Sequence, residues 1–384
     1  MIDVMGFIDR RQNVYVEAHI SDIHFGVMDP RVQYQILKEQ FLDTIYRMNV
    51  LDIISINGDL YDHKFMASSD AVMYASIFVN DLINICRMKH ATLILINGTA
   101  SHDADQLKLF IPYLKDPTVD IRIVINEVQF QYVKGKKILC IPELYGKGKD
   151  YYNYFLFKQG EYDSCYMHGT FMGAIHGKNT HNLDSDREPV FSIEDFGFCN
   201  GPVISGHVHV HNTYKQDFHY IGSPIRWQFG EEQDKGYIIL LHKPQTRQYH
   251  IHFQPITSFR YDTVYLDNML QDDPKRIIDY ITYLKSQGVD YLRVKFTKSV
   301  EDKINILKNY YRTKSNITIE TDFEQEQVRK EIQTLGDKYK EYDYLFDKNL
   351  SSNEILVRYM NQSEKTDYWT VDNLTQFLHD IEKL

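Results

Sequence analysis

The chain has 384 residues, 43% of them hydrophobic and 25% charged, which is the composition of a globular protein. No run approaches the roughly 18 apolar residues that a membrane span needs, and the amino terminus lacks the apolar segment of a secretory signal, so we expect a cytoplasmic protein without membrane contact. The formal net charge of -10 is spread along the chain and argues against a surface that binds nucleic acid through clustered Lys and Arg alone.

Residues 1–255 alternate short apolar runs with helix-like stretches, which is the pattern of an α/β fold. The first two helix-like stretches are Val32 to Met48 and Ser68 to Met88. The strand-like runs are VYVEAHI, LDIISIN, ATLILIN, IRIVIN, KKILCIP, SCYM, PVIS, GYIILL and QYHIHF. Runs that are apolar at nearly every position predict central strands covered on both faces, and the later, strand-rich portion predicts a second sheet. We predict a two-sheet sandwich flanked by helices.

Residues 256–322 have a different pattern, in which strand-like and helix-like segments alternate. The segments SFRYDTVYL, YLRVKF and NITIET are strand-like, whereas DPKRIIDYITYLKSQ and SVEDKINILKNYYR are helix-like. This order predicts a second, small α/β domain with a βαβαβ arrangement.

Residues 323–384 are polar, charged and helix-prone, and we predict a helical C-terminal tail. Near its end Thr370 can cap a helix, because a Ser or Thr at that position accepts a hydrogen bond from the first turn. The apolar residues of this helix share one face: Leu374, Phe377, Leu378 and Ile381. Two interpretations stay open, since this face could pack on its own domain or bind another protein.

Five polar clusters each follow an apolar, strand-like run. They are Asp22-Ile23-His24, Gly58-Asp59, Ser101-His102-Asp103, His168-Gly169 and Gly206-His207-Val208-His209. Open α/β sheets bind ligands beyond the carboxyl ends of their strands, so the five clusters can meet in one site. Side chains of an extended segment alternate between faces, which predicts that Asp22 points the same way as His24, and likewise His207 and His209. Each pair could then hold one metal centre.

The residue types in these clusters favour a centre with two metal ions. A carboxylate has two oxygens, so Asp59 could bridge two cations, and a shell of imidazole, carboxylate and water suits manganese, iron or zinc better than calcium. Two cations about 4 Å apart activate water, hold a phosphoryl group and stabilise an in-line displacement. His102 could then protonate the leaving oxygen, with Asp103 or Asp62 orienting its ring.

Each fragment alone is a weak signal, because a Gly-Asp pair is usually a turn and a D-x-H usually a solvated loop. Five such fragments in order, all at predicted strand ends, rarely arise from structural needs alone. His63 and His211 lie close enough in sequence to line the site, but they could equally be ordinary surface or core residues.

The ordered series D-x-H, G-D, H-D, H-G and G-H-x-H, which covers residues 22–209, resembles the motifs of the calcineurin-like metallophosphoesterase superfamily. The segment from Tyr220 to Glu231, followed by Lys235 and Gly236, is similar to the Y-P-G-S-P/I-x-R-x-S-F-G-E and K-G segment of the SbcD-type DNA double-strand-break repair nucleases. The resemblance implies a metallophosphoesterase fold for residues 1–255.

For the rest of the chain, the resemblance implies a DNA-capping domain at residues 256–322 and a partner-binding helical region at residues 323–384. The implied activity is that of a metal-dependent DNA nuclease, both exonuclease and endonuclease, that acts in DNA repair, recombination or replication. Its partners would be DNA, an SMC-like ATPase of the SbcC type and a second copy of the chain, with the homodimer contact on the stretch from Ser68 to Met88.

The resemblance also assigns ligands to two divalent cations, of which manganese is expected. One ion would be held by Asp22, His24, Asp59 and His209, and the other by Asp59, His168 and His207. The family usually reads G-N-H-D/E and uses the Asn as a ligand, whereas this chain reads Gly98-Thr99-Ala100-Ser101-His102-Asp103. We expect Ser101 in place of that Asn, and a weakly bound second cation, because a hydroxyl is a poorer ligand than an amide carbonyl.

Two other functions remain open at this point. The chain could be a phosphodiesterase of the same superfamily that acts on a small substrate. It could also be a degenerate phosphoesterase that serves as a scaffold, its altered third motif having cost it a metal.

Overall fold

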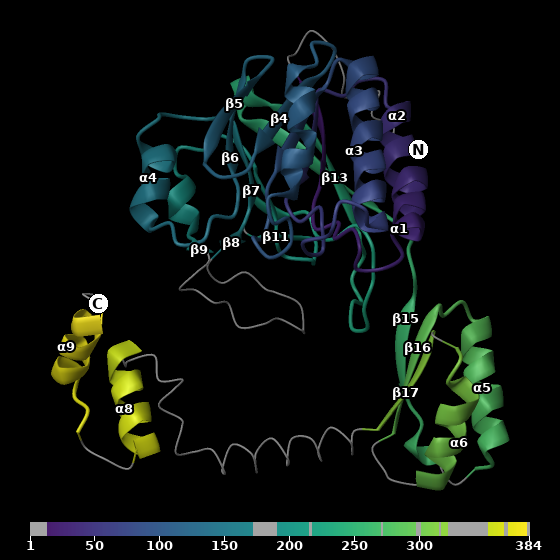
Figure 1. The fold of residues 1–384 in the computed structure, drawn as a ribbon. Coiled ribbons are helices and arrows are strands. Elements are labelled where there is room, and N and C mark those ends of the chain that lie inside the picture. Colours follow the sequence, from purple (N-terminus) through teal and green to yellow (C-terminus); the bar gives the residue numbers. More distant parts are fainter. Residues whose placement is uncertain are drawn as a thin grey trace. The chain divides into compact units, whose positions relative to one another are not determined.

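The computed structural model describes residues 14–171, 190–214, 217–269, 272–296, 301–314, 316–321, 352–364 and 368–381 (Figure 1). Internal contacts divide the chain into two compact units, Met1–Thr263 with Thr282–Leu292 and Val264–Ile281 with Arg293–Leu384. The domain boundaries expected at residues 255 and 322 stay predictions.

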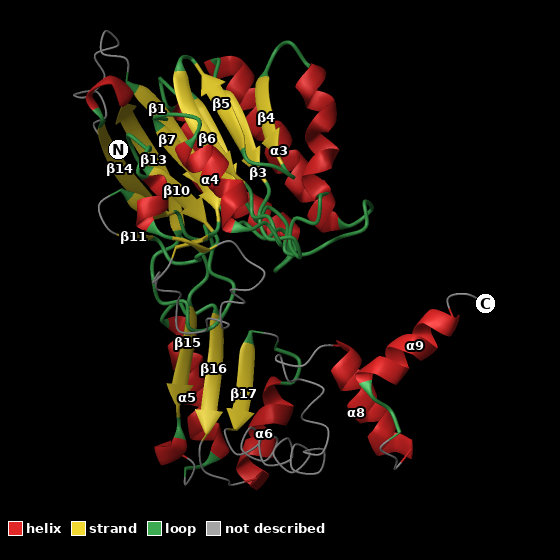
Figure 2. Cartoon of the chain, turned by 90° about the vertical axis from the view of Figure 1, so that its left-hand side faces the viewer, coloured by secondary structure: helices red, strands yellow, loops and turns green. Residues whose placement is uncertain are grey.

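The first sheet has the strand order β14-β13-β1-β2-β3-β4. Its strands β14, β13, β1, β3 and β4 are labelled in Figure 2. Its parallel strands are β1 (Tyr15–Ile20), β2 (Ile53–Asn57), β3 (Thr92–Ile96) and β4 (Asp120–Val124). The antiparallel strands β13 (Gly236–Lys243) and β14 (Gln248–Pro255) extend the sheet beyond β1. Every residue of β1, β2 and β3 is buried, as predicted for central strands covered on both faces.

The second sheet has the order β11-β12-β10-β7-β6-β5. Its parallel strands are β6 (Lys136–Ile141), β7 (Ser164–His168), β10 (Val203–Gly206) and β12 (Phe218–Tyr220). The antiparallel strands β5 (Gln129–Val133) and β11 (Asn212–Tyr214) form its edges. A short parallel pair, β8 (Thr170–Phe171) and β9 (Val190–Phe191), lies outside both large sheets.

The two sheets pack face to face, and helices cover their outer faces. The buried cluster between them combines Ile53 and Ile96 of the first sheet with Ile138 and Ile204 of the second. The first sheet is covered by α1 (Pro30–Leu37), η3 (Lys38–Leu42), α2 (Asp43–Arg47) and α3 (Asp70–Lys89), and the second by α4 (Lys149–Phe157). Short helical turns are η4 (Gln106–Lys115), η5 (Ile193–Phe196) and η6 (Pro244–Thr246). The fold is therefore mixed α/β with two large sheets, as predicted.

Nearby residues cap both ends of helix α3, and most of its apolar residues are buried. The Ser69 side chain accepts a hydrogen bond from the Val72 N–H at the start, and His90 takes a left-handed conformation at the end. In the stretch expected at a dimer contact, Val72, Ala75, Phe78, Val79 and Leu82 are buried. Met73 and Ile77 are 46% and 38% exposed, so both remain accessible to a partner.

The predicted βαβαβ order is observed after the sandwich. Its elements are β15 (Tyr261–Tyr265), η7 (Asp267–Met269), α5 (Pro274–Ser286), β16 (Tyr291–Phe296), α6 (Glu301–Tyr311) and β17 (Ile317–Thr321). The strands form a sheet in the order β15-β16-β17, in which Val294 and Phe296 are fully buried.

Two helices of the predicted tail are described, α8 (Ser352–Glu364) and α9 (Val371–Ile381). The predicted cap is confirmed, because the Asn373 N–H donates to Thr370 Oγ1 at 3.3 Å. Leu374 is buried, whereas the side chains of Phe377, Leu378 and Ile381 lie outside the described residues, so the partner of that face stays open. Among the described helices, none combines the length and apolar character needed to cross a membrane.

Candidate metal centre

The predicted site residues lie at the carboxyl ends of parallel strands in both sheets. Asp22 and His24 follow β1, Asp59 follows β2, His102 follows β3, His168 ends β7, and His207 and His209 follow β10. Strand β2 contacts β7 and β10, so the strand ends of the two sheets meet. The Asn57 carbonyl at the end of β2 accepts a hydrogen bond from His168 Nδ1 at 2.8 Å, which joins the two sheets at this point.

Four of these residues have a left-handed backbone: Asp22, His24, Asp59 and His207, with φ of 51°, 51°, 52° and 84°. Such conformations cost non-glycine residues about 1–3 kcal/mol and concentrate at functional sites. The loop after β1 is held by the Asp22 N–H on the Gly58 carbonyl at 3.1 Å and the His24 N–H on the Asp59 carbonyl at 3.0 Å. Asp22 and His24 therefore face the same cluster because of this loop, and not through the alternation of an extended strand as the sequence suggested.

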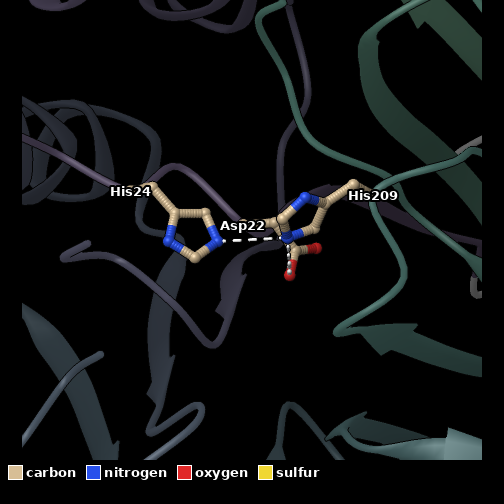
Figure 3. A group of neighbouring side chains, drawn as sticks. All are labelled: Asp22, His24 and His209. Atoms are coloured by element: carbon tan, nitrogen blue, oxygen red, sulfur yellow. Dashed lines mark hydrogen bonds and ion pairs between the residues drawn. The ribbon is translucent and has the colours of Figure 1, made fainter. Parts of the chain in front are cut away.

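The first cluster consists of Asp22, His24 and His209 (Figure 3). His24 Nε2 lies 3.2 Å from His209 Nε2, and His209 Nε2 lies 3.9 Å from Asp22 Oδ1. Burial lowers the pKa of His24 to about 4 and that of His209 to about 3, so both imidazoles are neutral at pH 7. Two neutral imidazole nitrogens and a carboxylate oxygen that converge in this way can hold one cation.

The second cluster consists of Glu143, His168 and His207. Glu143 Oε2 lies 3.2 Å from His207 Nδ1 and 3.5 Å from His168 Nε2. Because His168 Nδ1 donates to a backbone carbonyl, its Nε2 lone pair faces the cluster, which is the usual orientation of a histidine ligand. The sequence analysis missed Glu143, although it follows the apolar run KKILCIP in the same way as the other site residues follow theirs.

Asp59 lies between the two clusters and forms further candidate metal-holding groups, one with His24 and His102 and one with Asp22 and His168. Its Oδ2 is 3.6 Å from His24 Nε2 and 3.3 Å from His168 Nε2, and its Oδ1 accepts the Thr99 N–H at 2.7 Å. Burial by itself raises the pKa of Asp59, but His168 and His24 outweigh it and hold that pKa well below its usual value. Asp59 is therefore an ionised carboxylate that faces histidines of both clusters, and its role as a bridge between two cations stays a prediction.

Two glycines allow this close packing. A Cβ at Gly58, whose φ is +84°, would lie 2.2 Å from His168 Nδ1. A Cβ at Gly98 would lie 2.1 Å from Asp59 Oδ1. Any side chain at either position would displace a residue of the centre.

Ser101 does not lie in the position expected of a ligand. It is exposed, whereas the Thr99 hydroxyl lies 3.3 Å from Asp59 Oδ2, 3.2 Å from Glu143 Oε2 and 3.3 Å from His168 Nε2. The chain turns after Thr99, whose carbonyl accepts the His102 N–H at 2.9 Å, and this turn carries Ser101 away from the cluster. Ser101 therefore lies outside the cluster, and the hydroxyl that faces the cluster is that of Thr99.

The spacing of His207 and His209 suggested that they hold one centre together, but the structure places them in different clusters. His207 faces Glu143 in the second cluster, whereas His209 faces His24 in the first. The reason is the backbone at His207, which is left-handed and is fixed by its N–H on Asp22 Oδ1 at 2.8 Å. This division agrees with the ligand sets implied by the family resemblance.

The sequence suggested that Asp103 orients the ring of His102, but the carboxylate of Asp103 has a different role in the structure. Its carboxylate accepts backbone hydrogen bonds from Gly98 at 2.7 Å and from Asp59 and Tyr61 at 3.1 Å each. Burial and the nearby Asp59 carboxylate raise the pKa of Asp103 to about 7. Asp103 therefore holds the loops after β2 and β3 together and so positions Asp59.

His102 is oriented by a backbone group of Asp62. Its Nδ1 is hydrogen-bonded to the Asp62 carbonyl, which makes Nδ1 the donor and leaves Nε2 for other partners. The ring packs edge-on against His24 with the ring centroids 4.6 Å apart. The Asp62 carboxylate instead lies 3.7 Å from His24 Nδ1 and 2.9 Å from His63 Nδ1. His102 thus lies beside the first cluster and is oriented by a carbonyl, and its catalytic role stays a prediction.

The loop from Gly222 to Lys235 supports His209 through hydrogen bonds to its backbone. Lys235 Nζ donates to the His209 carbonyl at 2.9 Å, and the Ser223 N–H donates to the same carbonyl at 3.2 Å. Lys235 is buried and forms an ion pair with Glu231 at 2.6 Å. Trp227 packs against His209 with the ring centroids 5.2 Å apart. This segment therefore supports one wall of the first cluster.

The two histidines left open by the sequence take different positions. His63 is largely exposed at the rim, where it pairs with Asp62. His211 stacks on Phe253 with the ring centroids 4.0 Å apart and hydrogen-bonds the Tyr220 carbonyl, and it belongs to neither cluster.

The side chains of the centre fit divalent cations. Within the described part of the chain, the ion-pair partners of Asp59 and Glu143 are histidines. Two buried atoms, His24 Nδ1 and Glu143 Oε1, have no hydrogen-bond partner there. Buried polar groups without partners are costly, and a cation would satisfy the carboxylate and imidazole lone pairs that converge here. The two clusters could therefore hold metal ions.

Comparison with known proteins assigns no family. No protein-family model matches the chain, and no curated protein matches it. One crystal structure, whose title states no function, aligns with 63% of this chain and 99% of its own chain at 9% sequence identity and a TM-score of 0.36. A likeness at that level carries no argument, so function has to be inferred from the centre itself.

Proposed function

We propose that this chain is a metal-dependent phosphodiesterase with the calcineurin-like metallophosphoesterase fold, and that its substrate is DNA. The observation that carries the proposal is the position of Asp59, whose Oδ2 lies 3.6 Å from a histidine of one cluster and 3.3 Å from a histidine of the other. A carboxylate shared in this way supports a two-metal centre.

Two divalent cations, with manganese as the expected metal, would occupy the two clusters. Asp22, His24, Asp59 and His209 would hold one ion, and Asp59, His168 and His207 would hold the other. When bound, the cations would act as Lewis acids that activate water and stabilise charge on the attacking and leaving oxygens of a phosphodiester. Imidazole and carboxylate together suit manganese better than they suit calcium.

His102 would provide the proton that the leaving oxygen needs. Because its Nδ1 is fixed on the Asp62 carbonyl, a proton on Nε2 is the one that can be transferred. Its edge-on contact with His24 keeps it beside the first cluster without placing it in either of the ligand sets above. Asp103 contributes indirectly, through the three backbone N–H groups that fix the Asp59 loop.

The choice of DNA as substrate rests on the similarity of residues 220–236 to SbcD-type nucleases. These residues support the first cluster through Ser223 and Lys235, so the similar segment is part of the centre. With a net charge of -10, the cations rather than a basic surface would attract the phosphate backbone. We propose exonuclease and endonuclease activity in DNA repair, recombination or replication.

The proposed partners are an SMC-like ATPase of the SbcC type and a second copy of the chain. The βαβαβ unit would cap DNA, and the helical tail would bind the ATPase. On α3 the homodimer would use the exposed Met73 and Ile77, since the other apolar residues of the expected contact are buried in the core.

A manganese titration of DNA cleavage tests the proposal. End-labelled duplex DNA is incubated with the protein, with and without the ATPase, and a small chromogenic phosphodiester is assayed in parallel. We expect nucleotide release that requires manganese and is abolished by a chelator. Turnover of the small substrate alone would point to a small-molecule phosphodiesterase, whereas a folded protein that neither binds manganese nor cleaves either substrate would be a scaffold.

A further inference from the structure

The second cluster contains a carboxylate that the family resemblance does not assign. Glu143 follows β6, and its backbone N–H donates to the Asn97 carbonyl at 3.3 Å, which ties it to the end of β3. Its side chain is 1% exposed. Its Oε2 lies 3.2 Å from His207 Nδ1, 3.5 Å from His168 Nε2 and 3.2 Å from the Thr99 hydroxyl. One carboxylate oxygen thus faces the ligand atoms of three other site residues.

These contacts differ from those of an ordinary buried ion pair. The other oxygen, Glu143 Oε1, is buried without a hydrogen-bond partner among the described residues. A buried carboxylate normally has a fixed positive partner or several hydrogen bonds, because its desolvation otherwise costs several kcal/mol. Here the facing groups are His168 and His207, which are themselves expected to bind a cation through the nitrogens that face Glu143. Among the described residues, the ion-pair partners of Glu143 are therefore titratable imidazoles, and a cation bound to these nitrogens would replace their protons.

We propose that Glu143 is an oxygen ligand of the second cation, at the place where the family has an Asn amide. The inference rests on the proposed two-metal function and deepens it. Thr99 takes a supporting part, because its hydroxyl contacts both Glu143 Oε2 and Asp59 Oδ2 and so sets the distance between the two carboxylates. The second cation then has two carboxylates and two imidazoles as ligands.

This assignment reverses the expectation of a weak second ion. An ionised carboxylate binds a divalent cation more strongly than a neutral amide or hydroxyl does, and hard oxygen ligands favour manganese or magnesium. With Asp22, Asp59 and Glu143 facing two divalent cations, the loaded centre keeps one net positive charge, which still attracts a phosphodiester. The second cation is therefore bound tightly in this chain although the Asn is absent.

The test is manganese binding to the full chain without substrate. Calorimetric titration with Mn²⁺ and the electron paramagnetic resonance spectrum of the loaded protein give the number of ions and whether they are coupled. We expect two ions and a coupled spectrum for the wild type. In Glu143→Gln, which keeps the size of the side chain, the second ion should bind at least about 100-fold more weakly and the spectrum should become that of isolated Mn²⁺.

Controls separate this inference from the proposed function. Glu127→Gln removes an exposed carboxylate and should bind both ions like the wild type. If Glu143→Gln does not fold, Glu143→Asp, which keeps the charge but is shorter, should show an intermediate loss of the second ion. Two coupled ions in Glu143→Gln, bound within about threefold of the wild-type affinity, would overturn the role of Glu143 alone. A wild type that binds no manganese would overturn both proposals.

Discussion

The molecule contains two polar assemblies in its interior, and they differ in how the charges of their carboxylates are compensated. Between the sheets, Glu17 of β1 pairs with Lys136 of β6 at 2.5 Å, and Lys136 also donates to the Tyr166 hydroxyl at 2.9 Å. Although burial by itself raises the pKa of Glu17, Lys136 and His19 lower it below its usual value. At the strand ends, Asp59 and Glu143 face histidines. The interior network contains a lysine as its own cation, whereas at the centre the facing groups are histidines, and we propose that metal ions bind there.

The difference shows how a structural cluster can be told from a binding one. Both assemblies are mostly buried and both contain carboxylates and histidines, so residue type does not separate them. What separates them is whether a fixed charge completes the set, together with the left-handed residues, which gather at the centre. The predictions below test this distinction.

The largest effect is expected from Asp59→Asn, because this residue faces histidines of both clusters. The neutral amide should weaken both ions and lower cleavage by at least about 10³-fold. Manganese content measured by elemental analysis, together with nuclease assays, checks this. Two bound ions in this variant would show that Asp59 is not the bridge.

His102→Ala should lower cleavage by roughly 10²- to 10⁴-fold, because the proton donor is lost. Manganese content should stay near that of the wild type, since neither proposed ligand set includes His102. The two measurements are made on the same preparation as those for Asp59→Asn. Equal metal loss in the two variants would contradict the separate roles assigned to these residues.

Lys136→Met should act on stability and spare metal binding. It leaves Glu17 buried without its partner, which should lower the free energy of unfolding by about 3–5 kcal/mol in urea denaturation. Manganese bound per folded molecule should not change. The double variant Glu17→Gln with Lys136→Met serves as the control and should recover part of the loss. A drop in manganese stoichiometry would break the distinction between the two assemblies.

The two clusters should also differ in how pH affects their affinity for cations. Although burial lowers the pKa of His168 and His207, Asp59 and Glu143 respectively raise it overall, so these imidazoles hold their protons to higher pH than the imidazoles of the first cluster do. Binding of the second ion must displace them, and its affinity should rise by about tenfold per pH unit for each proton released. The first cluster, with pKa values of about 4 and 3, should bind almost independently of pH between about 5 and 8. Calorimetry in buffers of different ionisation enthalpy measures the protons released, and equal release at both sites would contradict this asymmetry.

Much of the sandwich could be predicted because its signals are local. The runs LDIISIN and ATLILIN, which are apolar at nearly every position, became β2 and β3, as expected of strands covered on both faces, and VYVEAHI became β1. The position of the histidines and aspartates at strand ends followed from the same runs. The predicted cap of α9 at Thr370 is likewise set by neighbouring residues.

The wrong predictions at the centre concern residues whose positions depend on folded loops and on contacts between segments that are distant in the sequence. A single glutamate after a strand looks like any surface residue, and only the packing of the two sheets brings Glu143 within 3.2 Å of His207. A turn that starts at Thr99 removes Ser101 from the cluster. Asp103 lies in a motif that predicts a catalytic role, but its carboxylate accepts hydrogen bonds from backbone N–H groups of the loops after β2 and β3.

The sequence by itself determined which strands form the sandwich and which chemical groups stand at their ends, because both depend on residues that are close in the chain. Only the tertiary structure decided which cluster each histidine joins and which carboxylates share the second cluster. Those choices depend on left-handed loop residues and on the contact between two sheets, and neither leaves a periodic pattern in the sequence.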